Sequence, residues 1–118
     1  MTSAATAGIT TVLHPVSDLA KAGKVYTALL GIAPQTEGTY YIGFDIGGQH
    51  IGLVPDGGPQ GMTAPVTYWQ VPDIAAKLAE VTAAGATVHE PVREVGEGRL
   101  VATVTDPDGN VLGLLQDR

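Results

Sequence analysis

Cysteine is absent from the 118 residues of the chain. Disulfides, thiolate nucleophiles and cysteine-based zinc sites are therefore excluded, and a cytoplasmic location is the default expectation. Lysine and arginine are scarce, 6 against 12 acidic residues, and they form no basic run. Because nucleic-acid backbones are bound by clustered Lys and Arg, we expect no nucleic-acid partner for a chain of net charge −6.

Long hydrophobic runs are missing as well. No apolar stretch approaches the roughly 20 residues that span a bilayer, so we expect no membrane partner. The opening residues MTSAATAG carry neither the basic nor the hydrophobic region of a secretory signal, and we interpret residues 1–8 as a flexible N-terminal leader. Aromatic residues make up only 5 % of the chain, but 44 % apolar residues suffice for the core of one globular domain.

What the chain does contain is an internal repeat. The stretches GQHIGLVPD (48–56) and GNVLGLLQD (109–117) align without a gap, and each has a glycine at its centre. The segments VSDLAKAGKVYTALLG (16–31) and VPDIAAKLAEVTAAG (71–85) also correspond. Both have capping residues near the start, apolar residues at helical spacing and a glycine at the end, so both predict a helix.

Strand-like sequence surrounds each predicted helix. One short run precedes it, and β-rich sequence with glycine turn signals follows it, although residues 32–41 are less clear. The chain therefore predicts an α+β fold of two tandem βαβββ modules that form a curved mixed sheet around a cavity. We place a single domain at 9–118, with module one at about 9–56, a linker at about 57–64 and module two at about 65–118.

This double pattern, with PVSDLAKAGKVYTALLG near the start and VTDPDGNVLGLLQD at the end, resembles the glyoxalase/bleomycin resistance/extradiol dioxygenase superfamily, also called vicinal oxygen chelate (VOC) proteins. The resemblance covers nearly the whole chain, and the DPDGN turn (106–110) before a strand is its most specific motif. It implies the fold of the small stand-alone glyoxalase-like members. It also implies a homodimer with pockets at or near the junction between the subunits.

Catalytic members of that superfamily hold one divalent metal ion through the first and last strands of each module. Carried over residue by residue, the four ligand positions correspond to Thr11, Gly52, Val66 and Gly113. None is a good ligand, because two have no side chain, one is aliphatic and one is a lone hydroxyl. The resemblance therefore implies that the metal site is absent, and we predict neither a metal nor another cofactor.

Candidate ligand-binding residues follow from the alternation of side chains along a strand. His50 lies two residues before Gly52 and is expected on the same face, although an exposed histidine at the sheet rim fits equally well. Tyr68 and Gln70 share a face with Val66, and together they would give a pocket an aromatic wall and an amide. The candidate ligand-binding residues are His50, Tyr68, Gln70, Tyr40, Tyr41, Trp69, Gly52 and Gly113.

Other polar and aromatic residues have simpler interpretations. Trp69 alternates with Tyr68, so a place in the core suits it better than a place in the pocket. Of Tyr40 and Tyr41 only one can face inward, and the sequence leaves open which. His14 is expected to point toward the first helix in a packing role, and His89 is expected at the surface.

Three classes of function remain. The first is a metal-free protein that binds a small organic molecule in its cavity, as some superfamily members do when they sequester an antibiotic. The second is a glyoxalase-like enzyme of the lyase, isomerase or dioxygenase type that acts without the usual metal, through His50 or Tyr68. The third is a metal-dependent enzyme, which the residues at the ligand positions disfavour. No catalytic residue is assigned from the sequence.

Overall fold

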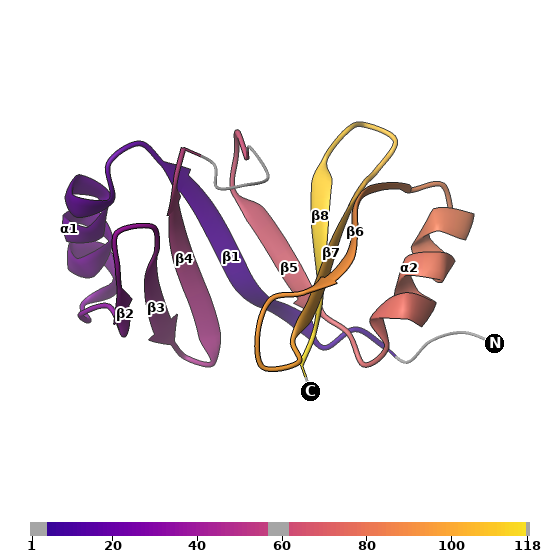
Figure 1. The fold of residues 1–118 in the computed structure, drawn as a ribbon, viewed down its shortest axis with the longest axis horizontal. Helices are drawn as coiled ribbons and strands as arrows, with labels where there is room; N and C mark the ends of the chain where they lie inside the picture. Colours follow the sequence, from indigo (N-terminus) through magenta and orange to yellow (C-terminus); the bar gives the residue numbers. More distant parts are fainter. Residues whose placement is uncertain (1–4, 57–61, 118) are drawn as a thin grey trace. The chain divides into compact units, whose positions relative to one another are not determined.

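The computed structural model describes residues 5–56 and 62–117 (Figure 1). Part of the expected leader, residues 1–4, and most of the expected linker, residues 57–61, lie outside the described residues. The chain divides into two compact units. The first unit is Thr10–Val66, and the second unit is Thr67–Arg118 together with Met1–Ile9.

The first unit has the element order βαβββ. Its elements are β1 (Gly8–Val16), α1 (Leu19–Leu30), β2 (Thr36–Glu37), β3 (Ile42–Ile46) and β4 (Gln49–Pro55). The strands lie side by side in the order β2-β3-β4-β1, with β1 parallel to β4 and the other neighbours antiparallel. A parallel pair needs a crossover connection, and α1 lies in the connection that leads from β1 toward β4.

The second unit repeats this arrangement. Its elements are β5 (Val66–Gln70), α2 (Ile74–Ala83), β6 (Thr87–Glu94), β7 (Leu100–Thr105) and β8 (Val111–Gln116). The strand order is β5-β8-β7-β6, with β5 parallel to β8 and the remaining neighbours antiparallel. Each strand thus has the neighbours of its counterpart in the first unit, and the expected α+β fold of two βαβββ modules is confirmed.

The two helices begin where the sequence predicts. Asp18 precedes α1, and its carboxylate accepts a hydrogen bond from the Lys21 N–H at 3.0 Å. Asp73 precedes α2 and accepts from the Ala76 N–H at 3.1 Å in the same way. Such a cap stabilises a helix by about 1 kcal/mol. Within residues 5–56 and 62–117, no helix is long and apolar enough to cross a membrane.

One face of each sheet packs against the helix of its own unit. In the first unit the fully buried Phe44 and Leu53 lie under the apolar side of α1. In the second unit Ala102 and Leu114 pack with Ile74 at the start of α2. Because side chains alternate along a strand, the residues between these core positions point to the opposite face of each sheet. That helix-free face carries most of the candidate functional residues.

Candidate functional site

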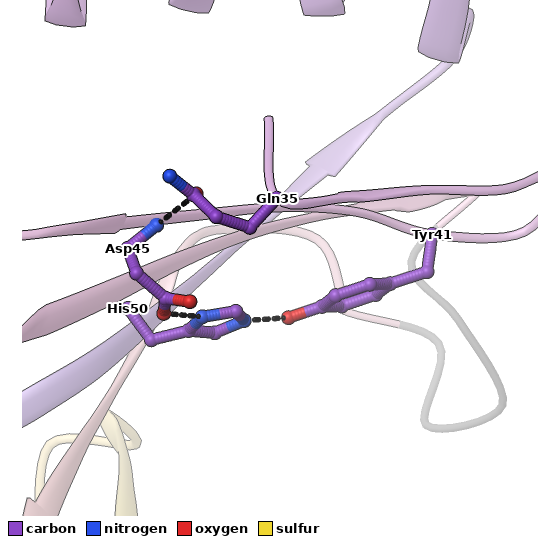
Figure 2. Close-up of polar contacts among 4 residues, drawn as sticks. All are labelled: Gln35, Tyr41, Asp45 and His50. Atoms are coloured by element: carbon purple, nitrogen blue, oxygen red, sulfur yellow. Dashed lines mark hydrogen bonds and ion pairs between the residues drawn. The ribbon is translucent and has the colours of Figure 1, made fainter. Parts of the chain in front are cut away.

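Three polar side chains of the first unit are joined in one chain of hydrogen bonds, which Figure 2 shows. The Tyr41 hydroxyl lies 2.5 Å from Nε2 of His50. The other ring nitrogen of His50, Nδ1, lies 2.6 Å from a carboxylate oxygen of Asp45. We call these three residues the Tyr41 site.

The register of β3 and β4 brings these residues together. Gly47 and Gly48 make a two-residue turn with φ of +57° and +80°, a combination that glycine adopts without strain. This turn pairs Asp45 directly with His50 across the hairpin. Tyr41 precedes Asp45 by four residues, so both side chains point to the same face of the sheet.

Two glycines make room for the ring of Tyr41. Gly43 and Gly52 are cross-strand partners on the same face. A Cβ atom on Gly43 would lie 2.9 Å from Cε2 of Tyr41, and one on Gly52 would lie 2.8 Å from its Cζ. Carbon atoms do not approach so closely, so any other residue at these positions would displace the ring. The ring lies nearly parallel to that of His50, with 10° between the planes.

The chemistry of the three side chains determines which atom donates and which accepts in each hydrogen bond. Asp45 as a carboxylate can only accept, so the Nδ1 of His50 donates to it. In a neutral imidazole the Nε2 is then the acceptor, and the Tyr41 hydroxyl donates to it. The Asp45 carboxylate thus fixes the orientation and the tautomer of His50, and His50 in turn fixes the phenol of Tyr41.

A fourth residue supports Asp45. The side-chain oxygen of Gln35 accepts a hydrogen bond from the backbone N–H of Asp45 at 2.6 Å. The backbone N–H of Gln35 itself donates to the carbonyl of Gly43. The side chain of His50 is 26 % exposed and that of Asp45 is 64 % exposed, so the site opens to solvent at its acidic end.

The residues at the four positions that the resemblance assigns to metal ligands do not fit a metal ion. Tyr41 fills the space beside Gly52, and the Tyr68 ring fills the space beside Gly113, where an added Cβ would lie 2.7 Å from Cε2 of that ring. Thr11 offers one buried hydroxyl and Val66 offers no donor. Within residues 5–56 and 62–117, no three His, Cys, Asp or Glu side chains are grouped so that they could hold a metal ion.

The second unit places its candidate residues as strand alternation predicts. Tyr68 pairs with Gly113 and Gln70 pairs with Leu115, so both lie on the helix-free face. Trp69 pairs with the core residue Leu114 and therefore points to the side of α2. Burial raises the pKa of the Tyr68 phenol, and the nearby Glu90 carboxylate raises it further, while the Arg93 guanidinium acts in the opposite direction.

The remaining candidates lie outside the Tyr41 site. Tyr40 is 82 % exposed, so of the two adjacent tyrosines it is Tyr41 that meets His50. His14 points toward α1, where its ring meets the ring of Tyr26 edge-on at 5.3 Å between centroids. Burial lowers the pKa of His14. His89 lies at the exposed edge strand β6 and contacts the Thr103 hydroxyl at 3.1 Å.

Sequence reasoning missed Asp45, Gln35 and Gly43. A usable signal for Asp45 was present, because a two-residue Gly-Gly turn at 47–48 fixes the partner of every residue in the hairpin. Counting outward from that turn pairs residue 46 with 49 and residue 45 with 50. No comparable signal exists for Gln35, which reaches Asp45 from the connection between α1 and β2.

Solved structures share this fold. Methylmalonyl-CoA epimerase from Mycobacterium tuberculosis superposes with a TM-score of 0.76 at 16 % sequence identity, over 100 % of this chain and 93 % of that one. The Mn(II)-bound glyoxalase from Novosphingobium aromaticivorans superposes with a TM-score of 0.73 at 19 % identity, over 95 % of this chain and 39 % of that one. At these identities the likeness concerns the fold: a two-module βαβββ protein.

The family follows from the sequence match. The family model described as "Glyoxalase/Bleomycin resistance protein/Dioxygenase superfamily" matches residues 8–114, and the chain belongs to this superfamily. The proteins named "Putative glyoxylase CFP32" of Mycobacterium tuberculosis (strain CDC 1551 / Oshkosh) and Mycobacterium bovis are 31 % identical over 111 residues. That match covers 85 % of this chain and 42 % of each relative, so the chain spans less than half of their length.

Proposed function

We propose that this protein binds a small organic molecule at the Tyr41 site and does so without a metal ion. The observation that carries the proposal is the chain of hydrogen bonds from Asp45 through His50 to Tyr41. A binding site needs a few polar groups held in fixed positions beside apolar or aromatic surface. Tyr41 supplies both, because its hydroxyl is oriented by His50 and its ring lies over two glycines.

The residues at the expected metal-ligand positions support binding without a metal ion. The positions at which superfamily members hold their metal carry two glycines, a valine and a threonine here. The space beside both glycines is filled by tyrosine rings. A bound molecule is therefore held by hydrogen bonds and ring contacts. The superfamily description includes bleomycin resistance, and sequestration of an antibiotic is the form of binding that we propose to test first.

Proton transfer is a second candidate function, and the Asp45–His50 pair favours it. A substrate with a C–H bond next to a carbonyl group would give that proton to the Tyr41 oxygen. At the same time the Tyr41 hydroxyl proton would pass to Nε2 of His50. The electron pair of the broken C–H bond stays on the substrate as an enolate, and the Asp45 carboxylate stabilises the resulting imidazolium. Return of the proton completes an isomerisation. General acid–base groups of this kind contribute typically 10²–10⁴-fold to a rate.

Binding is tested by titrating the full chain with metal-free bleomycin, in buffer with and without a chelator, and following its thermal unfolding. We expect the same stabilisation in both buffers and a loss of most of it in Tyr41→Phe and His50→Ala. Tyr40→Phe is the matched control, because it removes the neighbouring but exposed phenol. Stabilisation that requires an added divalent ion, or that survives in both Tyr41→Phe and His50→Ala, contradicts the proposal.

Proton transfer is tested separately with methylmalonyl-CoA, the substrate named for two of the structural relatives. The chain is incubated with it in D₂O, and loss of the α-proton signal is followed by NMR. Exchange that falls about 100-fold in His50→Ala and is unaffected in Tyr40→Phe supports the enzyme. Binding of methylmalonyl-CoA without exchange of its α-proton contradicts proton transfer and supports only the binding proposal.

A homodimer and a cytoplasmic location complete the proposed picture. The superfamily resemblance suggests the dimer, and the cytoplasm is the default location for a chain that has no disulfides. Sedimentation velocity of the purified chain measures the first. Immunolocalisation of the untagged chain measures the second.

A further inference from the structure

A second group of polar residues lies on the helix-free face of the second unit and is independent of the Tyr41 site. Tyr68, Gly113 and Thr103 form a row across β5, β8 and β7, because each is the cross-strand partner of the next. Partners in register point to the same side of a sheet. Tyr68 therefore lies over Gly113 with Thr103 beside it.

Irregular pairing of β6 extends this row. The register shifts between Val88 and Glu90 and again between Glu90 and Arg93. As a result Glu90 is the partner of Thr103, and Arg93 is the partner of Val101, which lies on the same face as Thr103. A regular strand would send residues three apart to opposite faces, so the bulges are what place this acid and this base together.

Three groups in this row have no partner within residues 5–56 and 62–117. The Tyr68 hydroxyl makes no hydrogen bond, although only 4 % of the residue is exposed. Neither the half-buried Glu90 carboxylate nor the Arg93 guanidinium has an ion pair or a side-chain hydrogen bond in this described part of the chain. Arg99 differs from these groups, because it pairs with Asp117 at 2.7 Å.

The Tyr68 hydroxyl has no hydrogen-bond partner among the described residues. Buried tyrosines usually find such a partner, so a molecule that reaches this hydroxyl would supply the missing acceptor. Burial and the charge of Glu90 raise the pKa of Tyr68, so the phenol stays protonated and acts as a donor. Arg93 acts on the same pKa in the opposite direction. The strand register places Glu90 and Arg93 on the face of the sheet that carries Tyr68.

We propose that Tyr68, Glu90 and Arg93 bind a small zwitterion, a molecule that carries a carboxylate and a protonated amine. The Tyr68 hydroxyl and the Arg93 guanidinium donate to its carboxylate, and Glu90 accepts from its ammonium group. A simple anion meets repulsion from Glu90, and a simple cation meets repulsion from Arg93. A molecule with both charges satisfies all three groups at once, which makes it the matching class of ligand.

The test uses straight-chain ω-amino carboxylates, from glycine to 6-aminohexanoate, titrated into the ¹⁵N-labelled full chain. Alkyl carboxylates and alkylammonium ions of the same lengths serve as singly charged probes. At least one zwitterion is expected to shift the amide signals of Gly113 and Thr103. Its affinity should exceed that of either singly charged probe of the same length about tenfold, the ratio expected when one charged contact is worth about 1.4 kcal/mol.

Variants assign the contacts. Arg93→Gln and Glu90→Gln should each weaken the zwitterion about tenfold, and Tyr68→Phe should weaken it about fivefold, in line with one neutral hydrogen bond. Glu97→Gln and Arg99→Gln, which remove charges at the β6–β7 hairpin, are the matched controls. Arg93 is exposed, so its variant keeps the test decisive if Tyr68→Phe fails to fold. The proposal is overturned if no zwitterion shifts these signals, if a singly charged probe binds as well, or if Arg93→Gln changes nothing.

Discussion

Replacement of Gly52 by alanine tests the structural basis of the Tyr41 site. The added methyl group would lie 2.7 Å from Cδ2 of Leu13 and 2.8 Å from Cζ of Tyr41. Both contacts are shorter than carbon atoms allow, so the Tyr41 side chain must leave its position or the strands must move apart. The first outcome breaks the hydrogen bond from Tyr41 to His50.

The expected cost can be worked from these contacts. Overpacking of this kind typically costs about 1–3 kcal/mol, and loss of one hydrogen bond costs about 0.5–1.5 kcal/mol. Alanine in a strand regains about 0.5–1 kcal/mol over glycine, because it has less backbone freedom to lose. Moving Tyr41 relieves its own clash but not the one with Leu13, so part of both costs applies. We expect Gly52→Ala to lower the free energy of unfolding by about 1–2 kcal/mol.

Urea denaturation followed by circular dichroism measures this change. The dependence of the free energy on urea should stay constant while the midpoint falls. Gly38→Ala is the matched control, since its added Cβ would lie 3.6 Å from the Tyr41 carbonyl oxygen, an ordinary contact.

A double-mutant cycle decides the cause. In a Tyr41→Ala background the second substitution, Gly52→Ala, should cost much less, because the ring that it displaces is gone. Equal costs in both backgrounds would refute the reasoning and place the strain elsewhere.

Three further predictions concern pH. Partial burial lowers the pKa of His14 in the folded chain, and its Nδ1 has no hydrogen-bond partner in residues 5–56 and 62–117. The unfolded chain therefore takes up this proton at a higher pH than the folded chain does. Stability should fall as pH falls below the ordinary pKa of 6.5, and urea midpoints should show less of this fall in His14→Phe. Hydrogen bonds from Asn110 hold the pKa of Asp106 below its ordinary value, so the contribution of Asp106 to stability is present at neutral pH and is lost as pH falls through that lowered pKa; ¹³C NMR titration should show the pKa rising in Asn110→Ala but not in Asp117→Asn. Glu90→Gln should lower the raised pKa of Tyr68. Ultraviolet titration, with Tyr68→Phe identifying the contribution of this phenol, would contradict the assigned cause if that contribution did not move.

Much of the fold and part of the site could be predicted from the sequence because both depend on short-range patterns. The two-residue alternation of β5 separates Tyr68 and Gln70 from Trp69, and the register agrees. The starts of the helices followed from the capping signals after Val16 and Val71, and the caps in the structure are Asp18 and Asp73. Their carboxylates accept from backbone N–H groups three residues away. These features need no knowledge of distant parts of the chain.

Other features depend on contacts that local patterns do not contain. The two-residue strand β2 exists because Thr36 and Glu37 pair with β3, and nothing in their own sequence requires a strand. The bulges of β6 place Glu90 and Arg93 on one face, whereas alternation alone would separate them. The sequence left open whether Tyr40 or Tyr41 faces inward, and in the structure it is Tyr41 that lies over Gly43 and Gly52.

The tyrosine rings over Gly52 and Gly113 couple positions that lie far apart in the sequence. A larger side chain at either glycine would collide with the ring that covers it. Removal of the tyrosine alone would leave an empty space beside a glycine. A change at one member of each pair therefore favours a change at the other, so Gly52 with Tyr41 and Gly113 with Tyr68 are expected to vary together among related chains.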